Sequence, residues 1–142
     1  MGTLYETDLV AWADEQAALL RTGNLAALDT SNIAEEIESA GISQRRELHS
    51  RMIGLIAHLL KWRFQPDHRS KSWRETIYHH RDEVEALLEH SPSLKRAFDD
   101  EKIMKGIWTK AVSVARRETH LDFPDTWIWP IDLILDENFW PD

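Results

Sequence analysis

The segment from Ser43 to about Gln65 constrains the fold more than any other part of this 142-residue chain. Wound as an α-helix, it presents an apolar face that covers half of the circumference or more. The face is formed by Leu48, Met52, Ile53, Leu55, Ile56, Leu59, Leu60, Trp62 and Phe64. A helix with so wide an apolar face packs against neighbours on more than one side, so the sequence predicts a helical bundle around this segment.

The other apolar residues also recur at helical spacing, and no run alternates as a β-strand does. The expected helices run from about Asp8 to Arg21, Thr30 to Ala40, Ser72 to about His90, and Ile131 to Leu135. The segment from Ser91 to Ala115 is expected to be either one long helix or a short helix and a long one with a break near Asp99 and Asp100. The predicted fold class is therefore all-α: one domain over residues 1–142, a helical bundle of about five main helices with a short C-terminal helix and an aromatic tail.

Two of these boundaries depend on single residues. Gly41 follows Ala40, and a glycine at that position is typical of a helix end. Ser72 is followed three residues later by Glu75, which is the capping-box pattern of a helix start. We therefore expect a turn at Gly41 and a helix that begins at Ser72.

The charged residues are sorted into three blocks along the chain. Residues 1–44 hold one basic residue and eight acids, a net charge of −7, and residues 45–81 hold nine basic residues and three acids, a net charge of +6. Residues 82–142 again carry −7. With a turn at Gly41, Glu35, Glu36 and Glu38 are expected to lie beside part of the basic block in an antiparallel helix pair.

The composition excludes several classes of protein and site. The chain has no cysteine, which excludes disulfides, thiolate zinc sites and cysteine nucleophiles. Its five glycines are dispersed and build no phosphate-binding loop or dinucleotide motif. The N-terminal residues lack the positive charge of a signal peptide, and no apolar run approaches the ~18 residues of a membrane span. We expect a soluble, cytoplasmic protein with no membrane partner.

The seven histidines raise the question of a metal site. His79 and His80 are adjacent, so on a helix they point about 100° apart and do not bind one ion from the same face. His79 and Glu83 share a face but supply only two ligands. We therefore expect no metal and no cofactor. With no catalytic motif in the chain either, we lean towards a protein that is not an enzyme.

Basic and aromatic residues alternate in the segment from Lys61 to Arg81. The candidate interaction surface there comprises Lys61, Trp62, Arg63, His68, Arg69, Lys71, Trp73 and Arg74, which we call the basic corner. Such residues suit phosphate contact and base stacking, and they also suit a protein partner. A purely structural role is the favoured reading, because basic side chains near a helix C-terminus complement its dipole and pair with acidic helices.

The C-terminal tail ends in two large aromatic rings, Phe139 and Trp140, followed by Pro141. Rings left in water at a terminus would be costly, whereas docking each one removes about 150 to 250 Å² from solvent. We expect the tail to dock, on its own bundle as the first choice and across a homodimer as the alternative.

Six separated blocks of the sequence carry a family resemblance. They are Leu4 to Asp8 followed by Trp12, Ile33 to Glu38, His58 to Trp62, Ser70 to Trp73, Ser91 to Leu94, and Phe139 to Pro141. Together they resemble the bacterial family called domain of unknown function twenty-nine over nearly the whole chain. The resemblance implies an all-α domain and assigns no activity to any residue.

Two functional hypotheses stay open at this stage. The first is a helical protein-interaction module that buries aromatic surface against another protein or a second copy of itself, which the high content of seven tryptophans favours. The alternative is a protein that binds or processes RNA or DNA through the basic corner. Binding that weakens steeply with salt would favour the alternative.

Overall fold

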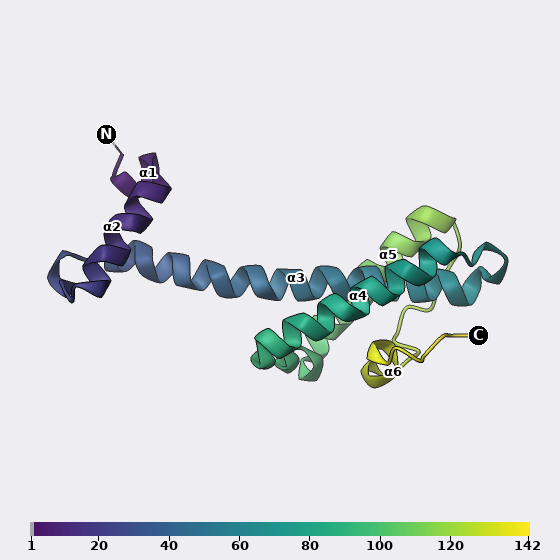
Figure 1. Ribbon diagram of the computed structural model, residues 1–142. Coiled ribbons are helices and arrows are strands. Elements are labelled where there is room, and N and C mark those ends of the chain that lie inside the picture. Colours follow the sequence, from purple (N-terminus) through teal and green to yellow (C-terminus); the bar gives the residue numbers. More distant parts are fainter. Residues whose placement is uncertain (1) are drawn as a thin grey trace. The chain divides into compact units, whose positions relative to one another are not determined.

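The computed structural model describes residues 2–142, and Figure 1 shows the order of the elements. The elements are α1 (Leu4–Thr7), α2 (Leu9–Arg21), the 3-10 helix η1 (Leu25–Ala27), α3 (Thr30–Phe64), η2 (Pro66–His68), α4 (Lys71–His90), η3 (Pro92–Asp99), α5 (Glu101–Thr119) and α6 (Ile131–Leu135). No strand occurs in this part of the chain. The predicted all-α class, with a short C-terminal helix and an aromatic tail, is confirmed.

The chain divides into two compact units. Unit 1 covers the residues up to Ser43, and unit 2 covers Gln44–Asp142. Helix α3 contributes its first turns to unit 1 and the remainder to unit 2. The prediction of one domain over residues 1–142 stays a prediction.

The turn expected at Gly41 is wrong, because α3 continues through this residue as one helix of 35 residues. Its neighbours Ala40 and Ile42 are helical too, and Gly41 is not among the residues with a positive φ angle. A glycine inside a helix costs about 1 kcal/mol relative to alanine. The many turns of helix on either side outweigh this cost, so the local stop signal has no effect.

The expected pairing of acidic and basic helices is wrong for the same reason. Since one continuous helix carries both segments, they cannot fold back on each other as an antiparallel pair. Within residues 2–142, none of Glu35, Glu36 and Glu38 forms an ion pair. Glu36 instead accepts a hydrogen bond of 2.6 Å from the Tyr5 hydroxyl. This carboxylate raises the pKa of Tyr5 to about 12.

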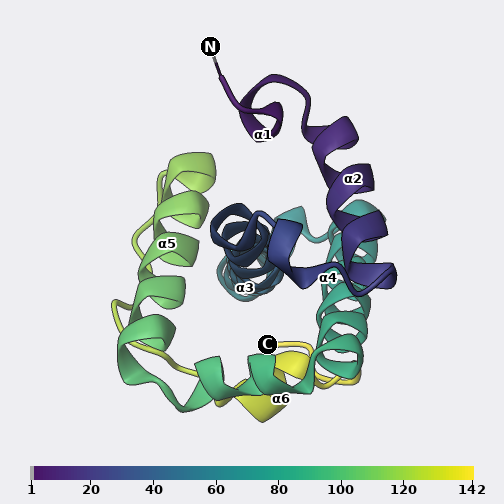
Figure 2. The same cartoon turned by 90° about the vertical axis from the view of Figure 1, so that its left-hand side faces the viewer.

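Unit 2 is a bundle around the C-terminal part of α3. In the view along this helix, α4 and α5 lie on opposite sides of it and α6 lies below (Figure 2). The core consists of Leu48, Met52, Leu55, Ile56, Ala57, Leu59, Leu60 and Trp62 of α3, with Ile77, Val84, Leu94, Ile107, Trp108, Ala111, Val112, Ala115, Phe123 and Ile134 around them. The apolar face read from the sequence is thus the face that the core buries.

Two helix starts in unit 2 depend on side-chain caps. Asp100 caps α5 by accepting hydrogen bonds from the backbone N–H groups of Lys102 and Ile103. Of the two forms that the sequence allowed for this segment, the structure has the short helix followed by the long one. The capping box predicted at Ser72 is wrong. Ser70 is the cap of α4, and its hydroxyl accepts from the Trp73 N–H at 3.1 Å. Ser70 has the extended backbone that a cap needs, whereas Ser72 already lies inside the helix.

Unit 1 is held together by polar contacts around Asp29. The Trp12 indole donates to Asp29 Oδ2 at 3.0 Å, and Gln16 Oε1 accepts from the Asp29 N–H at 2.8 Å. Gly23 ends α2 with a φ of 74°, as expected of a glycine after a helix. Trp12 and Gln16 are the two side chains that unit 1 buries among its described residues.

Candidate interaction surfaces

The basic corner does not lie wholly on the surface. Lys61 is buried: its ammonium donates to Glu118 Oε2 at 2.6 Å and lies 5.2 Å from the centre of the Trp73 ring. Trp62 is buried as well, against Trp140, with 4.8 Å between the ring centroids. These two residues of the candidate surface are therefore part of the packing of unit 2.

Arg69 of the corner holds the C-terminal tail. Its Nε donates to the Trp62 carbonyl at 2.8 Å, and its Nη2 donates to the Pro141 carbonyl at 3.2 Å. The guanidinium also lies over the Trp62 ring, 5.0 Å from the centroid. The bond to Pro141 joins the loop after α3 to the end of the chain, and Trp140 packs on Trp62 of α3, so the expected docking of the tail within its own bundle is confirmed.

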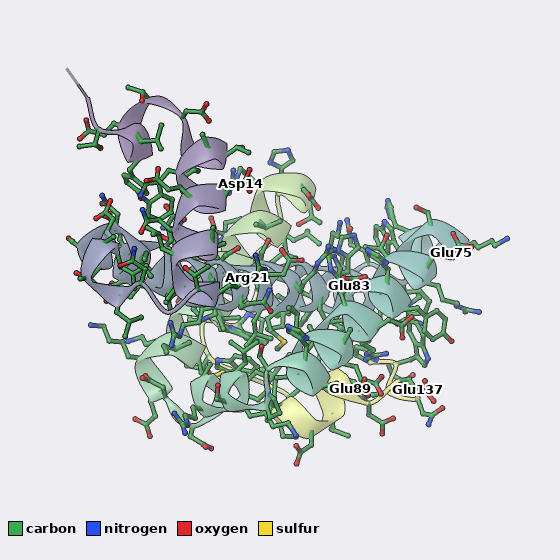
Figure 3. All side chains as sticks on the ribbon, turned by 60° about the vertical axis from the view of Figure 1, so that its left-hand side comes forward. Asp14, Arg21, Glu75, Glu83, Glu89 and Glu137 are labelled. Atoms are coloured by element: carbon green, nitrogen blue, oxygen red, sulfur yellow. The ribbon has the colours of Figure 1, made fainter. Side chains whose placement is uncertain are left out.

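The exposed members of the corner are Arg63, His68, Lys71 and Arg74. Arg74 lies 5.6 Å from the ring centroids of both Trp62 and Trp140. Lys71 forms an exposed ion pair of 3.8 Å with Glu75, whose place on α4 Figure 3 labels. These residues leave a small basic patch in solvent. That the basic corner forms an interaction surface stays a prediction.

Arg81 was not in the candidate set, yet it is the most buried cation of unit 2. The side chain is 4% exposed, and its Nε and Nη2 donate to the carbonyls of Ile134 and Phe139 at 2.8 and 2.9 Å. Burial lowers the pKa of this guanidinium. An arginine three residues before the apolar Val84 on the buried face of α4 is the one sequence signal that could have indicated this position.

Two histidines are half-buried between helices α3 and α4. His58 shares a hydrogen bond of 2.9 Å between its Nδ1 and the Gly54 carbonyl, and its ring centroid is 6.0 Å from that of His80. Burial lowers the pKa of both, and the pKa of His80 falls to about 4, with the charges of His58, Arg51 and His79 adding to the effect. Across residues 2–142 no three metal-binding side chains gather in one place.

Unit 1 exposes apolar side chains along its helices, including α2, on which Figure 3 labels Asp14 and Arg21. The large apolar side chains that it leaves in solvent are Leu4, Leu9, Val10, Leu20, Leu25, Ile37 and Ile42. Ile37 is 69% exposed, although it lies eleven residues, about three helical turns, before the fully buried Leu48. The buried face of α3 therefore continues into unit 1, where Ile33 is half-buried and Ile37 lies largely in solvent.

A family model described as "Domain of unknown function DUF29" matches residues 4–140. The chain belongs to the DUF29 family. The match covers both units of this DUF29 chain, and the family description assigns no activity. No curated protein and no solved structure matches the sequence. None of the helices described for residues 2–142 combines the length and apolarity that crossing a bilayer requires.

Proposed function

We propose that this DUF29 chain is a cytoplasmic, helical protein-interaction module that binds its partner through unit 1. The observation that carries the proposal is the change along one face of α3: Leu48 is fully buried, while Ile37 on the same face is 69% exposed. A chain without cysteine is compatible with the reducing cytoplasm.

The energetics of unit 1 support a partner. Chains of about 40 residues seldom bury enough surface to be stable without help from disulfides, metals or association. Unit 1 has no cysteine and buries two side chains of its own. Covering a large aliphatic side chain contributes about 1.5–3 kcal/mol, so a partner over Val10 and Ile37 would supply much of the missing stability.

The nucleic-acid alternative has weaker support. Lys61, Trp62 and Arg69 are occupied by contacts within unit 2, so they offer few free groups to a phosphate or a base. The net charge of −8 also opposes binding to a polyanion. A protein partner is the proposal that we retain.

Site-specific photo-crosslinking in the native host tests the proposal. A photoreactive amino acid replaces Ile37 in one variant and Ser39 in the control. Ser39 is equally a surface position of α3 but points to nearly the opposite side of the helix. We expect an adduct of one defined mass from position 37, identified by mass spectrometry, and none from position 39. No adduct at position 37, or equal labelling at both positions, would reject unit 1 as the docking surface.

A further inference from the structure

Unit 2 carries a groove that its own packing does not explain. The groove lies between α3 and α5 and has a volume of about 410 Å³. Its lining residues are His49, Ile53, Lys102, Ile103, Gly106, Ile107 and Lys110. Three isoleucines thus form an apolar floor, and Gly106 leaves its edge open, because a Cβ atom added there would meet nothing within 4 Å.

The rim of this groove is positively charged. Lys102, Gly106 and Lys110 follow one another at four-residue steps, so they share one face of α5. Both lysines are exposed, and within residues 2–142 neither forms an ion pair. Lys110 also acts on His49 across the groove, where burial and this charge lower the histidine pKa. An apolar floor with unpaired lysines suits an apolar ridge flanked by carboxylates.

Unit 1 offers a ridge of that chemistry. Ile33 and Ile37 lie one turn apart on α3, and Glu36 and Glu38 stand on either side of Ile37 in the sequence. The first 44 residues as a whole carry a net charge of −7. Two copies of unit 1 facing each other would repel, whereas unit 1 facing the lysine-rimmed groove would attract.

We propose that the groove between α3 and α5 binds unit 1 of a second copy of this chain. This inference rests on the proposed function of unit 1 and names its partner. Each copy carries both surfaces, so reciprocal exchange forms the same contact twice in a closed two-fold dimer. Forming it twice brings the buried area towards the roughly 1,200 Å² or more of stable interfaces.

A charge exchange between two variants tests the contact. The groove variant carries Lys102→Glu and Lys110→Glu, and the ridge variant carries Glu36→Lys and Glu38→Lys, the two acids beside Ile37. Lys102, Lys110 and Glu38 are exposed, and Glu36 is partly exposed. The molar mass of each full-length protein is measured by light scattering, alone and as an equimolar mixture. Circular dichroism confirms that both variants remain folded.

We expect the wild type to have the mass of a dimer, each variant alone the mass of a monomer, and the mixture the mass of a dimer again. The mixture recovers the dimer because the basic ridge of the ridge variant meets the acidic groove of the groove variant. The acidic ridge of the groove variant likewise meets the basic groove of the ridge variant. A monomeric wild type, or a dimer that neither variant weakens, would overturn the inference. The crosslinking at Ile37 tests the proposed function separately. If the wild type is a monomer but position 37 forms an adduct with a different protein, unit 1 remains a docking surface and only the second copy is rejected as its partner.

Discussion

Arg81 shows how a single charged residue stabilises this fold. Its guanidinium lies 5.5 Å from the centroid of the Trp140 ring and donates to the carbonyls of Ile134 and Phe139. These two carbonyls belong to α6 and the tail, whereas Arg81 belongs to α4. The residue therefore links the bundle to the end of the chain. The bonds from its Nε and Nη2 offset part of the cost of burying its charge, while its Nη1 is buried without a hydrogen-bond partner.

Replacing Arg81 with alanine should lower the free energy of unfolding by about 2–4 kcal/mol, because two carbonyls lose charged donors and the packing on Trp140 is lost. Arg74→Ala is the matched control, since this arginine covers the same Trp140 ring from solvent. Its loss should cost less than about 1 kcal/mol. Urea denaturation measures both variants, and equal costs would contradict the role given to Arg81.

The half-buried histidines between α3 and α4 make the folded state sensitive to acid. The pKa of His80 is lowered from 6.5 to about 4, so between these pH values the unfolded chain binds more protons than the native one. Stability should therefore be fully present above pH 6.5 and decline as the pH falls towards 4. Thermal melts across this range should show a smaller decline in His80→Gln than in the wild type. Identical pH profiles would show that His80 titrates normally in the folded protein.

At the scale of helices, a glycine is needed where a side chain of the neighbouring helix comes too close for a Cβ atom. A Cβ atom added at Gly54 of α3 would lie 2.6 Å from the His80 Nε2, whereas one added at Gly106 of α5 would meet nothing within 4 Å. Gly54 thus permits the contact between α3 and α4. Among residues 2–142, no neighbouring atom requires a glycine at position 106, which agrees with its place at the edge of the groove.

Alanine at these two glycines should act in opposite directions. Gly54→Ala should destabilise the protein by about 1–3 kcal/mol, because His80 must move. Gly106→Ala should stabilise it by about 0.5–1 kcal/mol, because alanine favours the helix and no neighbour obstructs it. Thermal melts of the two variants give the comparison. A neutral Gly54→Ala would mean that α3 and α4 are not in close contact there.

The C-terminal tail is an element held from several sides. Trp140 packs against Trp62 and Tyr78, with ring centroids 4.8 and 5.3 Å apart, and Arg69 and Arg81 bind the carbonyls around it. A chain that ends at Asn138 should lose on the order of 3 kcal/mol of stability, as for removal of a buried tryptophan. Its oligomeric mass should stay that of the full chain, because these contacts lie within one unit.

The control for this truncation is a chain that ends at Pro141 and lacks only the exposed Asp142. It should melt at the wild-type temperature. If the chain ending at Asn138 is as stable as this control, the tail contributes nothing to the fold. If it instead loses its dimer, the tail is exchanged between copies.

Across the whole molecule, the sequence predicted what depends on local periodicity and missed what depends on distant contacts. The apolar face from Leu48 to Trp62 follows from spacing alone. The burial of Lys61 depends on Glu118, 57 residues away, and no local pattern indicates that partner. The charge of the sequence block did not predict the basic face of Lys102 and Lys110, because acids elsewhere give residues 82–142 a net charge of −7.

The continuity of α3 is the other feature that local signals did not reveal. A glycine after Ala40 is typical of a helix end, but the stop requires a left-handed residue, and Gly41 stays helical. As a result the apolar face of the bundle extends beyond unit 2. The proposed docking surface of unit 1 rests on this extension, at Ile33 and Ile37.

The central claim is that unit 1 acquires its missing burial from a second copy of the chain. Hydrogen exchange of the backbone amides of α2 (Leu9–Arg21) at increasing protein concentration tests it most directly, with the core of α3 from Leu55 to Leu60 as an internal reference. We predict that protection of α2 rises with concentration, and that the rise disappears in the variant carrying Lys102→Glu and Lys110→Glu. Exchange in α2 that is the same at every concentration would contradict the account.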